Sequence, residues 1–150
     1  MAALWFPALL AEVRNLSGNL VTLHLTYLQD GKKLEGHTSR KLLSGTRGHD
    51  GCAVRLMSFE GPALGVAEGI ESAIAAEAIF QLPMWSCLNT ALLGNFTPPA
   101  DVKRLVIAAD NDDAGLKAAQ KLKGRFPNIT EIRIPKRKDF ADDLAARPRR

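Results

Sequence analysis

Residues 104–115 of this 150-residue chain read Arg-Leu-Val-Ile-Ala-Ala-Asp-Asn-Asp-Asp-Ala-Gly. The unbroken apolar run from Leu105 to Ala109 is typical of a strand that is buried on both faces. Acidic residues follow it directly, and a helical pattern begins at Asp113, with apolar residues at positions 114, 118, 119 and 122 and with Gly124 expected to close it. A buried strand that leads at once into a helix predicts a parallel α/β sheet.

The rest of the C-terminal half repeats this alternation of strand and helix. Short apolar runs predict strands, and longer runs with apolar residues three or four apart predict helices. Besides the strand at Arg104–Ala109, we expect strands at Leu64–Ala67, Met84–Leu88 and Glu131–Pro135, and helices at Ile70–Phe80, Asp113–Lys123 and Asp139–Ala146. The predicted fold class is α/β and Rossmann-like, with a central, mainly parallel four-stranded sheet flanked by helices.

The first 60 residues contain short alternating runs and turn signals, and they predict a small β-rich segment. We expect strands at Leu20–Leu28, Ala8–Asn15, Lys33–Gly36 and Ala53–Met57, and a glycine-rich loop at Ser44–Gly51. The predicted organisation is an N-terminal β-rich subdomain over 1–60, a catalytic domain over 61–146 and a basic tail over 147–150. Whether the first of these extends the main sheet or stands apart is open from the sequence.

Carboxylates follow two of the predicted parallel strands. Glu68 comes directly after one strand, and Asp110 and Asp112 come directly after another. Because the carboxyl ends of parallel strands meet at one edge of a sheet, we expect these side chains to converge. They would repel one another without a counter-cation, and oxygen ligands at a strand end suit Mg²⁺. The alternative for Asp112, as for Asp113, is that it caps the following helix.

Composition and charge narrow the class of protein. The chain carries 20 basic and 16 acidic residues, and the whole net charge of +4 lies from Arg133 onward. Such an end suits a polyanion such as nucleic acid, although a solvated tail would have the same composition. There is no signal-peptide pattern and no apolar run of the ~20 residues that span a bilayer. Cys52 and Cys87 lack disulfide-framework or zinc spacing, so we expect a reduced, cytoplasmic protein without membrane partners.

Three segments resemble the motifs of the Toprim domain family. Val66–Ala73 (Val-Ala-Glu-Gly-Ile-Glu-Ser-Ala) resembles their Glu-Gly motif, and Val106–Gly115 resembles their Asp-x-Asp motif. Lys138–Leu144 resembles the later Lys-Asp segment of Toprim primases. The resemblance covers residues 10–145 approximately and implies a Toprim fold. The variants are most similar to those of the primases of plasmids, phages and integrative elements, while other Toprim domains occur in topoisomerases and nucleases.

The resemblance implies a role for each acidic position. Glu68 would be a general acid or base, or a metal ligand, and Asp110 and Asp112 would be catalytic residues that hold Mg²⁺ or Mn²⁺. Asp139 would be a further metal-associated carboxylate, with Asp142 as the competing assignment.

The resemblance also assigns the basic turn before that helix. Lys136, Arg137 and Lys138 would contact the phosphates of a nucleotide or of a template strand. The bland alternative is a turn whose charges simply face water.

The function that the resemblance implies is DNA primase activity, a metal-dependent nucleotidyl transfer that makes RNA primers on single-stranded DNA. The expected partners are the template and nucleotides, with a helicase or a separate zinc-binding module as further candidates, because no cysteine–histidine cluster is present. The alternatives are a metal-dependent nuclease and a nucleic-acid-binding or docking module with little activity alone. A topoisomerase is disfavoured, because the only tyrosine, Tyr27, lies in a predicted N-terminal strand.

Overall fold

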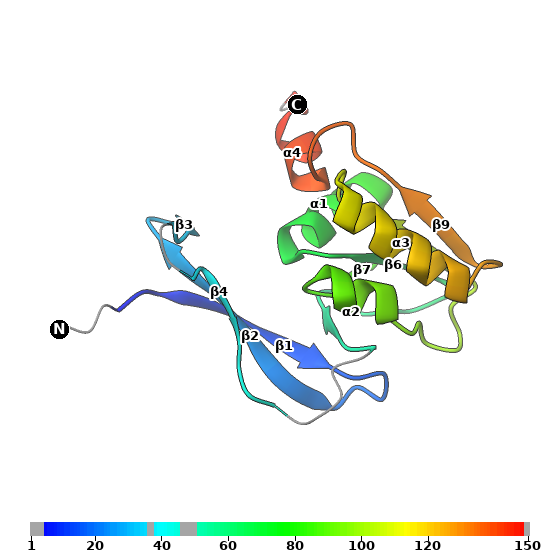
Figure 1. Ribbon diagram of the computed structural model, residues 1–150, viewed down its shortest axis with the longest axis horizontal. Helices are drawn as coiled ribbons and strands as arrows, with labels where there is room; N and C mark the ends of the chain where they lie inside the picture. Colours follow the sequence, from blue (N-terminus) through cyan, green and yellow to red (C-terminus); the bar gives the residue numbers. More distant parts are fainter. Residues whose placement is uncertain (1–4, 36–37, 46–50, 149–150) are drawn as a thin grey trace.

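The protein is described by a computed structural model that covers residues 5–35, 38–45 and 51–148. The strands in these ranges are β1 (Ala8–Arg14), β2 (Leu20–Gln29), β3 (Lys32–Lys33), β4 (Arg40–Leu42), β5 (Ala53–Arg55), β6 (Ala63–Ala67), β7 (Met84–Ser86), β8 (Arg104–Ala108) and β9 (Thr130–Arg133). The helices are α1 (Ile70–Phe80), α2 (Thr90–Asn95), α3 (Asp113–Arg125) and α4 (Phe140–Ala145). These strands form one sheet in the order β3-β2-β1-β5-β7-β6-β8-β9, with β4 beside β2 (Figure 1).

The C-terminal part of this sheet is parallel and is covered on both faces. β6 lies between β7 and β8, β9 lies outside β8, and all three pairings are parallel. One hydrophobic cluster packs α2 and α3 against one face, and a second packs α1 and α4 against the other. The predicted fold class, a mainly parallel four-stranded sheet flanked by helices, is confirmed.

The apolar run in β8 fills both clusters. Leu105 and Ile107 belong to the cluster beneath α2 and α3, whereas Val106 and Ala108 belong to the cluster beneath α1 and α4. None of the four is more than 1% exposed. Because neighbouring residues of a strand point to opposite faces, a strand covered on both faces needs apolar residues at every position.

The N-terminal strands extend the same sheet at its other end. β1 and β2 form an antiparallel hairpin, which reaches away from the helices in Figure 1. β5 joins the hairpin to the parallel part, since Val54 pairs with Val13 of β1 on one side and with Ser86 of β7 on the other. The hairpin and the parallel strands are therefore continuous through a strand of three residues.

The structure corrects several expected boundaries. α3 does not end at Gly124 but runs to Arg125, because Gly124 keeps a helical conformation and Phe126 takes the capping position. The short helix α2 was not expected; its N-cap is Asn89, whose side chain accepts a hydrogen bond from the Leu92 N–H at 2.9 Å. β4 was also not expected, and it is held by pairing with β2 rather than by its own composition.

Other expected segments lie partly outside the described residues. This applies to the strand predicted at Lys33–Gly36, of which the structure gives β3 at Lys32–Lys33, to positions 46–50 of the glycine-rich loop, and to positions 149–150 of the basic tail. Within the described ranges no helix has the length and apolar character needed to cross a bilayer. Cys52 and Cys87 are both buried thiols, not joined to each other by a disulfide.

We predict that Ile107→Ala destabilises the protein strongly. Ile107 is 0% exposed in the centre of the sheet, so the truncation leaves a cavity and should lower the free energy of unfolding by about 2–5 kcal/mol. Urea denaturation measures the change. Ile134→Ala is the matched control, because Ile134 is 52% exposed and its truncation should have a much smaller effect. Equal losses in the two variants would contradict the assigned core.

Candidate active site

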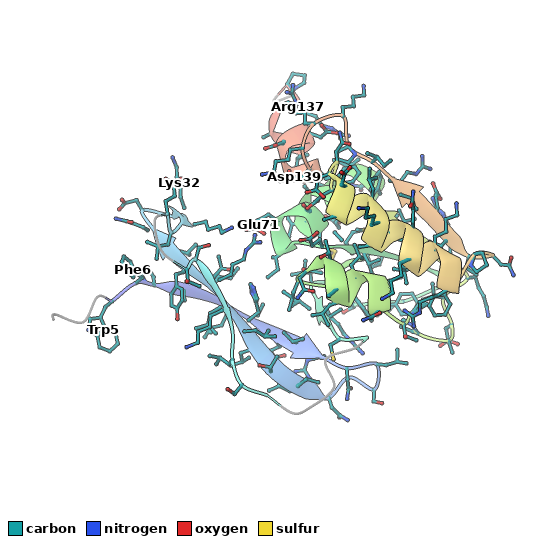
Figure 2. The ribbon with its side chains drawn as sticks, in the orientation of Figure 1. Trp5, Phe6, Lys32, Glu71, Arg137 and Asp139 are labelled. Atoms are coloured by element: carbon teal, nitrogen blue, oxygen red, sulfur yellow. The ribbon has the colours of Figure 1, made fainter. Side chains whose placement is uncertain are left out.

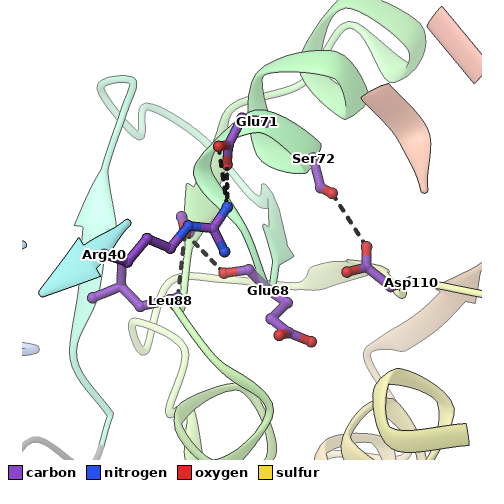
Figure 3. A network of polar contacts seen from close by, with 7 residues as sticks. Arg40, Glu68, Glu71, Ser72, Leu88 and Asp110 are labelled. Carbon is purple, nitrogen blue, oxygen red and sulfur yellow. Dashed lines mark hydrogen bonds and ion pairs between the residues drawn. The ribbon is translucent and has the colours of Figure 1, made fainter. Parts of the chain in front are cut away.

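The site lies where two neighbouring parallel strands end. Ala67 of β6 pairs with Ala108 of β8, so the residues that follow these strands leave the sheet at the same edge. Glu68 follows β6 directly, and Asp110 lies two residues beyond β8. In Figure 3 the Glu68 side chain lies between Arg40 and Asp110. This edge opens into a cavity of ≈ 290 Å³, called the carboxylate cleft below, and its lining residues are Lys33, Arg40, Glu68, Gly69, Glu71, Ser72, Asp110, Lys138 and Asp139.

Four of the residues singled out from the sequence line this cleft together: Glu68, Asp110, Lys138 and Asp139. Asp139 reaches it from the start of α4, where its Oδ1 also accepts a hydrogen bond from the Asp142 N–H at 2.8 Å. Asp142, the competing assignment, lies one turn into the helix and outside the lining.

Asp112 has the capping role that was its alternative interpretation. Its Oδ1 accepts a hydrogen bond from the Gly115 N–H at 2.7 Å, and this bond begins α3. Asp112 does not line the cleft, although its charge still acts on Glu68 and Asp110. One carboxylate oxygen is thus engaged by the helix.

Burial, together with the charges of neighbouring carboxylates, raises the pKa of Glu68 and of Asp110. Burial raises the pKa of Glu68 above its ordinary value, and the charges of Asp110 and Asp112 raise it further, while Arg40 opposes them. Burial likewise raises the pKa of Asp110, Asp139 and Asp112 add to this, and a hydrogen bond from Ser72 opposes it. Ionised carboxylates in the cleft are therefore destabilised by burial and by mutual repulsion. A bound cation would relieve this repulsion.

The donor set fits a hard divalent cation. All of the candidate ligands are carboxylate oxygens, which Mg²⁺ and Mn²⁺ prefer to nitrogen or sulfur. In the ranges that the structure describes, no three side chains of His, Cys, Asp or Glu stand close enough together to form a ready-made metal cage. A Mg²⁺ site of one or two carboxylates completed by waters and substrate phosphates needs no such cage.

Ser72 fixes the orientation of Asp110. Ser72 is 5% exposed, and its Oγ donates a hydrogen bond to Asp110 Oδ1 at 3.2 Å (Figure 3). A similar bond holds the other motif, since Ser86 Oγ donates to the Glu68 carbonyl oxygen at 2.9 Å. Both acidic positions are thus tied to neighbouring elements of the fold.

Gly115 allows the first turn of α3 to pack against the backbone of Asp110. A Cβ at Gly115 would lie 2.8 Å from the Asp110 carbonyl oxygen, which is too close, and 3.2 Å from the Asp110 nitrogen, which is a tight contact. Glycine, which has no Cβ, permits this close approach of two backbone segments. The position of Asp110 therefore depends on the absence of a side chain there.

Two cations from the N-terminal strands also belong to this site, and neither was identified from the sequence. Lys33 on β3 and Arg40 on β4 both line the carboxylate cleft. The Arg40 guanidinium donates to both carboxylate oxygens of Glu71, each at 3.0 Å (Figure 3). Burial alone would raise the pKa of Glu71, but a backbone hydrogen bond and the charge of Arg40 outweigh it and lower that pKa. Only the sheet pairing brings these residues here, so no local pattern could reveal them.

The basic turn 136–138 is held by its backbone. Asp143 accepts hydrogen bonds from the N–H groups of Lys136 at 2.8 Å and of Arg137 at 2.9 Å. On the other side, Asn111 donates its side-chain amide to the Arg137 carbonyl at 3.1 Å and its own N–H to the Lys138 carbonyl at 2.8 Å. The turn is thus fixed directly to the segment that contains Asp110.

We predict that Asp110→Asn stabilises the metal-free protein at neutral pH. The folded protein holds protons on Glu68 and Asp110 above their ordinary pKa, so the free energy of unfolding falls as pH rises through that window. Removing one charge should raise the melting temperature at pH 7 in the presence of a chelator, and the difference should vanish in acid. Asp101→Asn, at an exposed position, is the control. A lower melting temperature for Asp110→Asn would contradict the assigned repulsion.

Comparison with known proteins identifies the family of the domain. The sequence model of the Toprim domain matches residues 63–149, and that of a domain of unknown function, DUF7146, matches residues 2–56. No curated protein sequence matches the chain.

Solved primase structures share the fold at low sequence identity. The primase fragment of the bacteriophage T7 primase-helicase is 14% identical, with a TM-score of 0.66 over 91% of this chain and 59% of its own. The RNA polymerase domain of Mycobacterium tuberculosis DnaG is 16% identical, with a TM-score of 0.60 over 95% and 52%. A DnaG catalytic domain bound to single-stranded DNA is 13% identical, with a TM-score of 0.61 over 92% and 47%.

The chain matches only part of each of these primase structures. The chain spans between 47% and 59% of the length of these three structures, whose identities show the fold alone. The family follows from the sequence model, which covers more than half of the chain. With its strand-end acids, its parallel sheet and this match, the chain belongs to the Toprim domain family.

Proposed function

We propose that this Toprim domain is the catalytic domain of a DNA primase, of the type found in plasmids, phages and integrative elements. The reaction would be metal-dependent nucleotidyl transfer that joins ribonucleotides into primers on a single-stranded DNA template. The observation that carries the proposal is the make-up of the carboxylate cleft: its lining combines three carboxylates with three cations, namely Glu68, Asp110 and Asp139 with Lys33, Arg40 and Lys138. A metal-bound triphosphate needs both kinds of group, carboxylates for the cation and cations for its phosphates.

The acidic residues would hold the ion. Asp110 and Asp139 offer oxygens that already face the cleft, and Glu68 and Asp112 complete the set that the family motifs imply. Mg²⁺ or Mn²⁺ in this position would orient the triphosphate and offset its charge as the bond to phosphorus forms.

Glu68 is proposed as the general base. Its raised pKa brings the carboxyl closer to the operating pH, where proton transfer is most effective. It would accept the proton of the attacking 3′-hydroxyl as the O3′–Pα bond forms and the bond between the α- and β-phosphates breaks, so that pyrophosphate leaves.

The cations are proposed to hold the leaving group. Lys33 and Lys138 would contact phosphate oxygens, and Arg40 would exchange the two Glu71 carboxylate oxygens that it now contacts for oxygens of a phosphate. Single-stranded DNA is the proposed template, and a DnaG catalytic domain of the same fold has been solved bound to single-stranded DNA. A helicase or a zinc-binding module is proposed to act in the same protein or as a separate partner.

We predict that Glu68→Gln lowers the rate of primer synthesis by about 10²–10⁴-fold, because the amide cannot accept the proton. Purified protein with Mn²⁺ or Mg²⁺, single-stranded template and ribonucleotides tests this, with labelled products separated on a gel. Glu60→Gln is the matched control, since Glu60 is exposed and remote from the cleft lining.

The products also separate the alternatives. Shortening of the template without added nucleotides, lost in Asp110→Asn, would replace the primase assignment by a nuclease. Absence of both activities, even with zinc-binding and helicase modules added, would leave a nucleic-acid-binding module instead.

We also predict that Gly115→Ala weakens Mn²⁺ binding. The added methyl group must push the Asp110 backbone away from the position that the cleft requires. Electron paramagnetic resonance of free Mn²⁺ measures binding without relying on activity. Gly124→Ala is the control on the same helix, because its Cβ would meet nothing within 4 Å; it should leave Mn²⁺ binding unchanged and add about 0.5–1 kcal/mol to stability. Unchanged Mn²⁺ affinity in both variants would show that Asp110 is not a ligand.

A further inference from the structure

The basic turn sends its side chains to two different places. Lys138 lines the carboxylate cleft, whereas Lys136 and Arg137 line a second, larger cavity of ≈ 530 Å³ between α1 and α4. This second cavity, called the α1–α4 cavity below, is lined by Ile79, Lys136, Arg137, Phe140, Asp143, Ala146, Arg147 and Pro148. In Figure 2 Asp139 lies at the start of α4, and Arg137 lies above it, toward the C-terminal end of that helix.

The rim of the α1–α4 cavity is positively charged. Lys136, Arg137 and Arg147 supply three cations, and no ion pair between described residues involves them. The one carboxylate in the lining is Asp143, and its two oxygens accept the N–H groups of Lys136 and Arg137 at 2.8 and 2.9 Å. Asp143 therefore serves mainly to shape the turn, and an excess of positive charge is left facing the cavity.

The remaining lining of the α1–α4 cavity is apolar. Ile79 comes from the end of α1, Phe140 is 4% exposed at the start of α4, and Ala146 and Pro148 follow that helix. Inorganic phosphate would use only the cations and would leave this surface uncovered. A ligand that combines a flat apolar group with phosphate uses both, and a nucleotide unit has this composition.

The cavity is also mechanically joined to the carboxylate cleft. Asn111, between Asp110 and Asp112, donates hydrogen bonds to the carbonyl oxygens of both Arg137 and Lys138. Arg137 and Lys138, which are adjacent residues of one fixed turn, thus line the two different cavities.

We infer that the α1–α4 cavity is a second nucleotide-binding site, in which Lys136, Arg137 and Arg147 hold the phosphate and the apolar lining holds the base. It deepens the proposed function, since the same nucleic acid or nucleotide would serve both cavities. The ligand is a nucleoside phosphate, either free or as one unit of a single strand.

Fluorescence anisotropy of the full chain tests the site. The probe is a labelled oligothymidylate, in a chelator and at several salt concentrations, so that binding does not depend on metal or synthesis. The cavity variant combines Lys136→Gln, Arg137→Gln and Arg147→Gln. The matched control combines Lys103→Gln, Lys117→Gln and Lys123→Gln, which remove the same charge at exposed positions away from the cavity. Circular dichroism melting confirms that both variants fold.

The cavity variant should bind the oligonucleotide about tenfold more weakly than the wild type, with a salt slope reduced by about one, while the control variant changes much less. An abasic strand of equal length should bind the wild type more weakly than oligothymidylate does, and this difference should shrink in the cavity variant. Competition by ATP would identify a site for free nucleotide, and competition by unlabelled strand alone would identify a strand site; both support the inference.

Equal weakening of oligonucleotide binding in the cavity and control variants would overturn the inference. The inference would also be overturned if the wild type bound neither ATP nor the strand. If the wild type makes no primers but the cavity variant shows the expected weakening of strand binding, the proposed function is wrong and the second site stands. If the wild type makes primers and the cavity variant makes primers and binds the strand as the wild type does, the second site is wrong and the proposed function stands.

Discussion

The parallel pairing of β6 with β8 is the interaction on which the site depends. It fixes Ala67 beside Ala108, so that Glu68 and Asp110 must leave the sheet at the same edge, and the pairing is maintained by side chains that are almost entirely excluded from water. The repulsion between the carboxylates opposes this arrangement, and the buried sheet is strong enough to impose it. A site that gathers like charge needs a rigid support of this kind, because a flexible one would let the charges separate.

The details around the acids follow the same logic. The Ser72 hydroxyl donates a hydrogen bond to Asp110, and the first turn of α3 packs closely against the Asp110 backbone because Gly115 has no side chain. Asn111 then joins this segment to the turn that contains Lys138 by a backbone hydrogen bond. Opposite them stands the ion pair of Arg40 with Glu71, which joins the N-terminal strands to α1. Exposed pairs of this sort add little to stability, so its significance lies in where it holds the guanidinium.

The sequence was sufficient for those features that local patterns encode. The apolar run of β8 predicted a strand buried on both faces. The positions of Glu68 and Asp110 after two parallel strands predicted that both residues lie at the same edge of the sheet. The membership of Lys33 and Arg40 in the cleft could not be predicted, because it comes from pairings between strands far apart in the chain. The prediction that Gly124 ends the helix was wrong. Glycine ends many helices because it readily takes a left-handed conformation, but Gly124 does not take that conformation in α3. The division of the basic turn between two cavities likewise depends on the packing of α1 and α4.

Because β5 has only three residues, the hairpin is attached to the rest of the sheet over a short distance. The attachment is at Val13 and Arg14 of β1, and Val13 pairs with Thr22 of β2. Arg40 lies opposite Thr26, four residues farther along β2, which is about 13 Å at 3.3 Å per residue. A twist of about 5° at β5 would therefore move Arg40 by about 1 Å, which is enough to make or break a hydrogen bond. The distance between Arg40 and the carboxylates therefore depends on the twist of the sheet at β5. A ligand that contacts both would also fix that twist.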